Sequence, residues 1–206
     1  MAGRRRSGGS RAGRPAPEPP EREGEEAPDG AVRDADPVAL ARTIALRQLT
    51  AAPRSRAELA QAMARRDVPE EAAEAVLDRF TELKLVDDAA YAEMLVRSRH
   101  TTRGLARRGL AHELRAKGIE DATAAAALDQ LGPEQELATA RALVARKLGG
   151  TARLEPEVRL RRLAGMLARK GYPPGLALRV VKDALAAEGA DLADPDDGDG
   201  DGPLDE

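Results

Sequence analysis

The feature that most constrains this chain is one sequence pattern that occurs three times. The stretches RAELAQAMARRDVPE, RRGLAHELRAKGIED and LRRLAGMLARKGYPP cover residues 56–70, 107–121 and 160–174. In each stretch two apolar residues lie four positions apart, one turn along the same face of a helix, and a basic turn with Gly or Asp follows. The copies are offset by 51 and then 53 residues, which predicts a repeat unit of about fifty residues.

Equivalent positions in the three copies suit the end of a helix. The predicted buried pairs are Leu59 and Met63, Leu110 and Leu114, and Leu163 and Leu167. The position after the helix holds Asp67, Gly118 or Gly171. A residue there commonly adopts the left-handed conformation, which Gly reaches freely and Asp tolerates. The residue before it is Arg or Lys, a cation at the negative end of the helix dipole. We therefore expect three equivalent helix ends.

The rest of the chain between the tails also reads as helix. Asp36-Pro37 predicts one helix start, and Ser55 with Glu58 forms a capping box at another. The expected helices cover about 37–49, 55–66, 69–80, a segment from Asp87 or Asp88, then 104–117, 120–131, 133–148, 156–170 and 173–187. The sequence thus predicts an all-α fold of three tandem three-helix repeats, at 38–86, 87–132 and 133–187. Stacked units of this kind predict an elongated, gently curved body.

Both ends of the chain have a composition typical of disorder. Residues 1–37 are rich in Pro, Arg, Glu and Gly with little to bury, and residues 188–206 contain nine acids and no base. Such segments cannot offset the entropy of ordering, so we expect two disordered tails. The acidic tail has two interpretations that the sequence leaves open. It either keeps the protein soluble or competes with a polyanionic partner for a basic surface.

Charge is distributed unevenly along the chain. The formal net charge is −3, but residues 38–187 hold 26 Lys and Arg against 19 Asp and Glu, a net of +7. From 141 to 182 there are 11 bases and 2 acids. Solvated helix faces would explain single residues, but the asymmetry favours a surface for nucleic acid or an acidic protein face. The candidate contact residues are Arg97, Arg99, Arg103, Arg107, Arg108, Arg115, Lys117, Arg159, Arg161, Arg162, Arg169 and Lys170.

Catalytic and metal-binding signals are missing from the sequence. The chain has no Cys, and its two histidines, His100 and His112, are twelve residues apart, which favours capping or solvent-facing roles. Asp87-Asp88 is better explained as a helix start, and no phosphate-binding or nucleophile motif occurs. We expect no enzyme activity, no cofactor and no metal. No apolar window approaches a membrane span and the basic start lacks an apolar segment, so the expected location is the cytoplasm.

The aromatic residues restrict how nucleic acid would be bound. Phe80, Tyr91 and Tyr172 are the only three, and all lie at positions of the apolar pattern. We expect them in the core, which leaves no aromatic platform for stacked bases. Any nucleic-acid binding should therefore address the backbone of single or double strands, without sequence preference.

The strings LVDDAAYAEMLVRSR and RGLARRGLAHELRAKGI resemble the signature of RecX regulatory proteins. The segments ALRQLT and SRAELAQAM before them, and LRRLAGMLARKGY after them, are similar to the family's first and third repeats. The resemblance covers about 40–186. It departs from the family pattern at Asp67, where a Gly is usual.

The resemblance implies a modulator of the RecA recombinase in DNA repair and the SOS response. Members of the family dock along the groove of the RecA–DNA filament and limit filament growth, strand exchange, ATP hydrolysis and co-protease activity. The implied partner is the RecA filament, and the expected state is a monomer with no membrane contact. A second hypothesis is a DNA-binding helical-repeat protein that acts without RecA. End-capping and groove-coating of the filament both remain open.

Overall fold

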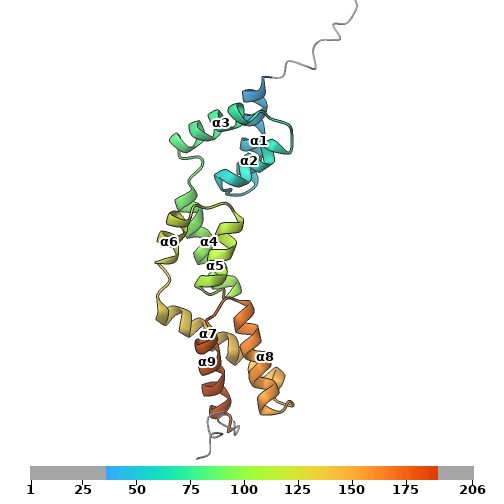
Figure 1. Ribbon diagram of the computed structural model, residues 1–206, viewed down its shortest axis with the longest axis vertical. Helices are drawn as coiled ribbons and strands as arrows, with labels where there is room; N and C mark the ends of the chain where they lie inside the picture. Colours follow the sequence, from blue (N-terminus) through green and yellow to red (C-terminus); the bar gives the residue numbers. More distant parts are fainter. Residues whose placement is uncertain (1–35, 190–206) are drawn as a thin grey trace, which may run out of the picture. The chain divides into compact units, whose positions relative to one another are not determined.

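The computed structural model describes residues 36–189, and these form only helices and the turns between them. The predicted disordered tails, 1–37 and 188–206, lie outside the described residues except for Asp36, Pro37, Glu188 and Gly189. Within the described range the helices follow the three predicted sets of three (Figure 1). The all-α three-repeat fold is therefore confirmed.

Repeat 1 consists of α1 (Pro37–Ala51), α2 (Arg56–Ala64) and α3 (Glu70–Glu82). The carboxylate of Asp36 accepts a hydrogen bond from the backbone N–H of Val38 at 3.0 Å, and Pro37 is the first residue of α1. Ser55 and Glu58 form the predicted capping box of α2. These contacts satisfy N–H groups that have no partner within a helix, so short sequence signals fix both helix starts.

Repeats 2 and 3 have the same layout. Repeat 2 contains α4 (Asp88–Arg103), α5 (Arg107–Ala116) and α6 (Asp121–Leu128). Repeat 3 contains α7 (Pro133–Leu148), a 3₁₀ turn η1 (Gly149–Thr151), α8 (Pro156–Arg169) and α9 (Pro174–Ala187). One boundary differs from the prediction. Gly104, with φ of 60°, ends α4 instead of starting α5, because its left-handed conformation cannot continue a helix.

Each repeat has its own apolar core. The predicted residues of the second helices, Leu59, Met63, Leu110, Leu114, Leu163 and Leu167, are buried, and so are Phe80, Tyr91 and Tyr172. The three cores draw almost entirely on their own repeats, and the main helix contacts stay within each repeat. Ala106 is an exception, since it precedes α5 in repeat 2 but belongs to the core of repeat 3. Repeats 2 and 3 therefore share apolar surface at their boundary.

The three predicted helix ends are equivalent in the structure. Asp67, Gly118 and Gly171 have φ of 56°, 70° and 90°, all in the left-handed region. The residue after each one donates its N–H to a carbonyl five positions earlier, as when Ile119 bonds to Leu114 at 3.1 Å. This pattern satisfies carbonyls that the helix leaves free. The left-handed conformation inferred from the sequence is confirmed.

Packing between repeats adds a second requirement at two of these positions. A Cβ on Gly118 would lie 2.3 Å from the Cβ of Ala57 in repeat 1. A Cβ on Gly171 would lie 2.2 Å from the backbone nitrogen of Gly109 in repeat 2. Asp67 is exposed, so its side chain meets no such neighbour in the described structure. The departure from Gly at Asp67 therefore falls where no close contact between repeats has to form.

We predict that Gly118→Asn lowers the free energy of unfolding by roughly 1–3 kcal/mol, a typical cost of overpacking. Asn tolerates the left-handed conformation, so the loss isolates the clash with Ala57. The matched control, Asp67→Asn, should stay within about 0.5 kcal/mol of the unchanged protein. Urea denaturation followed by circular dichroism measures both values. Equal effects of the two substitutions would contradict the role of the close contact.

Candidate functional site

The boundary between repeats 1 and 2, called the first junction, joins the start of α2 to the end of α5. The hydroxyl of Ser55 donates to the carbonyl of Lys117 at 2.6 Å. The carboxylate of Asp88 accepts from the backbone N–H of Arg56 at 2.8 Å, so a residue of repeat 2 caps a helix of repeat 1. Both bonds require the close approach that Gly118 permits.

Glu58 is the ionic centre of the first junction. Its carboxylate accepts from Lys117 Nζ at 2.6 Å, from the Tyr91 hydroxyl at 3.1 Å and from the Ser55 backbone at 3.3 Å. Burial disfavours the charged form, but the bonds from Lys117, Ser55 and Tyr91 outweigh it and lower the pKa of Glu58 below its ordinary value. Burial and the adjacent Glu58 charge raise the pKa of Tyr91 to about 12. The charge of Lys117 is therefore balanced by the carboxylate of Glu58.

Most of the other predicted contact residues in repeat 2 also have acidic partners. Arg99 and Arg103 share Glu113, with N–O distances of 3.0 and 2.5 Å. The remaining pairs are Arg97 with Glu93, Arg107 with Asp129, and Arg115 with Asp121. Exposed pairs of this kind contribute only about 0–1 kcal/mol. They still reduce the positive charge that repeat 2 offers to a partner.

Arg107 also has a structural role that the sequence did not reveal. Its guanidinium donates to the carbonyl of Leu128 at 2.8 Å, at the last residue of α6. Its backbone N–H donates to Glu136 at 2.8 Å, so Glu136 caps α5 as Asp88 caps α2. Replacing Arg107 would therefore affect the fold as well as the surface charge.

Arg159 does not belong to an exposed basic surface, which corrects the prediction for this residue. Its exposed fraction is 6%, and it donates to Thr151 Oγ1 at 3.3 Å and to the carboxylate of Glu188. These bonds connect η1, α8 and the end of α9. The charge pattern could not separate Arg159 from its neighbours, because burial depends on which face of α8 meets the core.

Four predicted residues are exposed cations that form no ion pair within the described residues: Arg108, Arg161, Arg162 and Arg169. The same holds for residues of repeat 3 that the prediction did not single out, which are Arg141, Arg146, Lys147, Arg153 and Arg179. All of these except Arg108 lie in the 141–182 stretch whose excess of bases the sequence shows. Repeat 3 therefore presents more unpaired positive charge than repeat 2.

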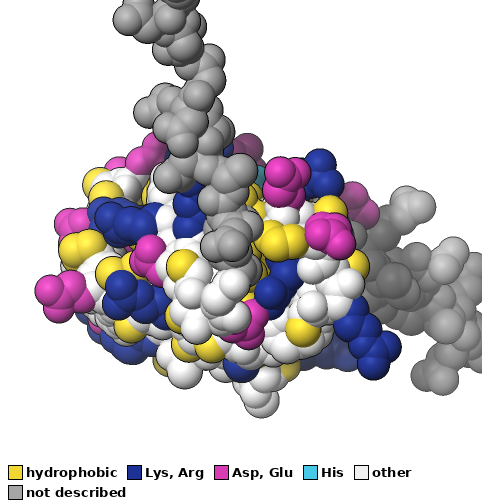
Figure 2. Space-filling model, turned by 90° about the horizontal axis from the view of Figure 1, so that it is seen from below, with side chains coloured by type: hydrophobic (Ala, Val, Ile, Leu, Met, Phe, Trp, Pro, Cys, Tyr) yellow, Lys and Arg dark blue, Asp and Glu magenta, His cyan; other side chains and the backbone are white. Residues whose placement is uncertain are grey.

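Lys and Arg side chains do not form a uniform positive face in the view of Figure 2. Lys and Arg side chains lie among acidic and apolar ones across the surface drawn there. On that side a polyanion would meet local clusters of positive charge. The relevant question is therefore where several cations lie together with fewer acids than cations.

One such cluster lies between repeats 2 and 3, at the second junction, where the start of α5 meets the end of α8. The carbonyl of Lys170 accepts from the backbone of Ala106 at 2.9 Å, and Lys170 Nζ donates to the carbonyl of Arg103 at 2.5 Å. Tyr172 donates its hydroxyl to the carbonyl of Gly104 at 3.2 Å. Burial, together with the positive charges of Arg103 and Arg146, lowers the pKa of Lys170. This lysine lies among like charges.

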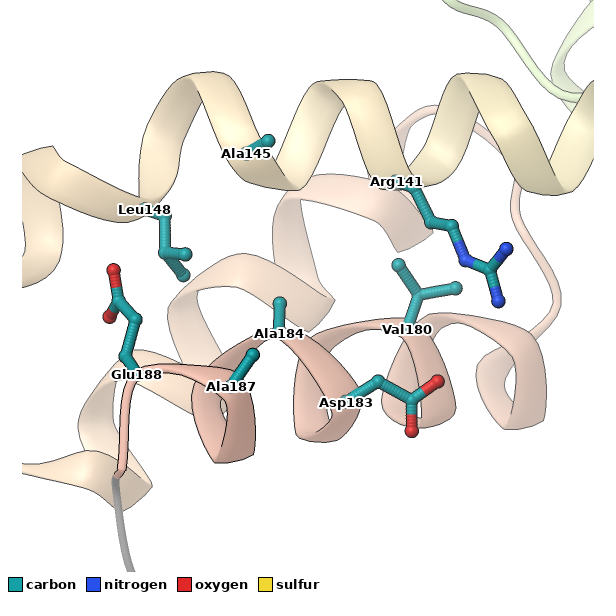
Figure 3. Close-up of a pocket in the computed structure, with 8 residues that line it drawn as sticks. All are labelled: Arg141, Ala145, Leu148, Val180, Asp183, Ala184, Ala187 and Glu188. Carbon is teal, nitrogen blue, oxygen red and sulfur yellow. The ribbon is translucent and has the colours of Figure 1, made fainter.

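A different hollow, between α7 and α9, is apolar (Figure 3). Arg141 and Asp183 lie near one end and Glu188 at the other, with mainly alkyl side chains between them. Ala184 lines this hollow. The equivalent positions in repeats 1 and 2 hold the larger, buried residues Phe80 and Leu131. Smaller side chains in repeat 3 thus account for it. Its lining offers no nucleophile beside a base.

The histidines take structural or solvent-facing positions. His100 is buried, with Nδ1 2.9 Å from the Leu105 carbonyl and Nε2 2.9 Å from the Thr139 hydroxyl, so it closes the end of α4. His112 is exposed. Between residues 36 and 189 no group of three or more His, Cys, Asp or Glu is placed to hold a metal ion, and no helix there is long and apolar enough to cross a membrane.

The fold and surface define a class of protein: tandem three-helix repeats with clusters of unpaired cations. Family models match all three repeats. They describe the first, second and third three-helix domains of RecX and match residues 41–80, 87–128 and 134–181. The chain belongs to the RecX family of regulatory proteins.

Relatives and solved structures agree with this assignment. The chain is 60% identical to the regulatory protein RecX of Streptomyces coelicolor, over 76% of this chain and 83% of the relative. It is 54% identical to that of Thermobifida fusca, over 83% and 94%. The crystal structure of RecX from Lactobacillus salivarius superposes with a TM-score of 0.65 at 21% identity, covering 72% of this chain and 97% of that one, which shows a shared fold.

We predict that Glu58→Gln destabilises the protein in a pH-dependent way. The folded-state pKa of Glu58 is lowered, so the ionised group stabilises the fold above its unfolded pKa, and this contribution is lost as pH falls through the folded value. At pH 7 the free energy of unfolding should drop by roughly 1–3 kcal/mol. The difference from the unchanged protein should shrink below about pH 4.

Thermal melts across a pH series measure this effect. Glu71→Gln is the matched control, because Glu71 is exposed and forms no ion pair within the described residues. It should change stability by less than about 0.5 kcal/mol at any pH. A Glu58→Gln effect that stayed constant down to acidic pH would show that the charge of Glu58 does not stabilise the junction.

Proposed function

We propose that this protein binds RecA–DNA filaments and inhibits the recombinase, ATPase and co-protease activities of RecA in DNA repair and the SOS response. Membership in the RecX family carries the proposal. In this proposal the protein acts by binding, as a monomer in the cytoplasm, without catalysis or a cofactor. The clusters of unpaired cations support a polyanionic partner such as this filament.

The proposed contact residues are the members of the predicted set that are exposed or half-buried. Arg108, Arg161, Arg162, Arg169 and Lys170 rank first, since no acid pairs with them in the described structure. The ion-paired residues Arg97, Arg99, Arg103, Arg107, Arg115 and Lys117 rank second, because a partner must first compete with their acids. Arg159 is excluded by burial.

The same surface supports a second candidate function, sequence-independent DNA binding without RecA. Unpaired arginines contact phosphates whether or not a recombinase covers the strand. Both functions predict binding that weakens with salt. The two functions differ in the amount of protein that inhibition requires. A protein that competes for bare DNA must cover the strand, whereas one that interferes with a filament needs only a few bound molecules.

We predict inhibition of RecA ATP hydrolysis on single-stranded DNA at a protein-to-RecA ratio far below one, with DNA in excess. A bound molecule that limits filament growth affects many RecA subunits, so little protein should suffice. Steady-state ATP hydrolysis over a range of ratios provides the measurement. Inhibition only at amounts that saturate the DNA would favour the second candidate.

We also predict that replacing Arg161, Arg162 and Arg169 together with Ala weakens filament binding. If each contacts a phosphate of a single strand, the slope of log affinity against log salt should shrink by about 0.7 per residue. The control replaces Arg42, Arg65 and Arg66 in repeat 1, which are likewise exposed and unpaired in the described structure, so equal charge is removed. Fluorescence anisotropy of filaments on labelled DNA gives both slopes. Equal losses would show that only total charge matters.

A further inference from the structure

The two junctions are built alike but differ in one charged group. Lys117 at the first junction and Lys170 at the second are equivalent residues at the ends of α5 and α8. Lys117 has Glu58 as its partner at 2.6 Å. The position equivalent to Glu58 in repeat 2, 51 residues later, is Gly109. The second junction therefore lacks the acid that neutralises the first.

Packing explains why no acid can take that position. A Cβ on Gly109 would lie 2.6 Å from the carbonyl oxygen of Lys170. Any side chain there would separate α5 from α8. The close contact that joins the repeats thus also removes the carboxylate, and Lys170 Nζ donates to the carbonyl of Arg103 instead.

The surroundings of Lys170 are positive. Burial lowers the pKa of Lys170, and like-charge repulsion from Arg103 and Arg146 lowers it further. Glu113 pairs with Arg103 but is shared with Arg99, and Arg146 has no ion pair within the described residues. An anion placed among these cations would relieve the repulsion that the fold leaves in place.

Space for an anion lies next to this cluster. A polar hollow between the end of α4 and α7 is lined by residues that include Thr101, Gly104, Gln135 and Arg146, while the Thr139 hydroxyl in it is already bonded to His100 Nε2. Hydroxyl, amide and guanidinium groups donate hydrogen bonds to phosphate oxygens. Gly104 directly follows Arg103, so the cation cluster and the donors of the hollow are adjacent.

We propose that this hollow at the second junction binds a phosphate group of a nucleic-acid backbone. The inference rests on the proposed function in one respect, because it assigns the DNA of the filament to this surface. A free phosphate and a backbone phosphate have the same hydrogen-bonding chemistry. Helix α8, which ends beside Lys170, also carries the unpaired cations Arg162 and Arg169, which favours a polyanion over a single free anion. They lie about 10 Å apart along α8, which suits a chain of phosphates.

Arg146 is the residue to vary, because it is exposed and holds no structural ion pair within the described residues. Binding of a fluorescein-labelled oligothymidylate is measured by anisotropy, without RecA. Arg146→Ala should weaken binding roughly three- to tenfold and reduce the log-salt slope by about 0.7. The control, Arg65→Ala in repeat 1, should leave both nearly unchanged.

Arg146→Glu separates a binding role from a structural one. The new carboxylate would supply Lys170 with the acid that Glu58 supplies to Lys117. Oligothymidylate binding should fall further than with Ala, while the melting temperature stays equal or rises. A lower melting temperature with unchanged binding would overturn the proposal, and so would Arg146 variants that bind normally.

Competition distinguishes the sources of the anion. Polyglutamate represents an acidic protein, and inorganic phosphate at constant ionic strength represents a free anion. The proposal requires that oligothymidylate binding depend on Arg146 and that neither competitor displace it at an equal concentration of charge. Displacement by either one would overturn the assignment to nucleic acid. Oligothymidylate binding and inhibition of RecA ATP hydrolysis are measured on the same Arg146 variants. Loss of one property without the other shows that the phosphate site and the inhibition of RecA are separate, so each proposal can fail by itself.

Discussion

The close backbone contact between the second helices of consecutive repeats determines the rest of the structure. At Gly118 the end of α5 lies against the start of α2, and at Gly171 the end of α8 lies against the start of α5. Neither contact leaves room for a Cβ on the glycine. Each of these glycines also has a left-handed backbone, so one residue ends a helix and joins two repeats. Hydrogen bonds from Ser55 to Lys117 and from Tyr172 to Gly104 join the repeats at these two junctions.

The same contact determines where charge remains unpaired. At the first junction the start of α2 carries Glu58, which neutralises Lys117 and accepts a hydrogen bond from the Tyr91 hydroxyl. At the second junction the helix start carries Gly109, and Lys170 is left beside Arg103 and Arg146. In the proposed binding mode the first junction is structural, whereas the equivalent second junction binds an anion. At the position of Glu58, repeat 2 has Gly109.

This arrangement suits a protein that regulates by binding. The three cores occupy the interior of their repeats, and the charged groups of the described residues, except the buried Arg159, lie on the surface or at the junctions. The apolar hollow between α7 and α9 results from the small side chain of Ala184, and its lining lacks the paired groups that catalysis requires. The surface that we propose for binding is therefore the set of unpaired cations, which are concentrated in repeat 3. A filament with a repeating pattern of phosphates presents the complementary surface.

The sequence by itself determined the helices, their grouping in threes and the left-handed ends at Asp67, Gly118 and Gly171, because these depend on local periodicity and capping. It also placed the excess of positive charge in repeat 3. Only the tertiary structure decided which cations are available, since pairs such as Arg107 with Asp129 join residues far apart in the chain. It buried Arg159, and it showed that Gly118 and Gly171 are needed for packing as well as for conformation. The availability of the cations and the packing at the glycines both depend on distances between residues that are remote in the sequence. No local sequence pattern contains these distances.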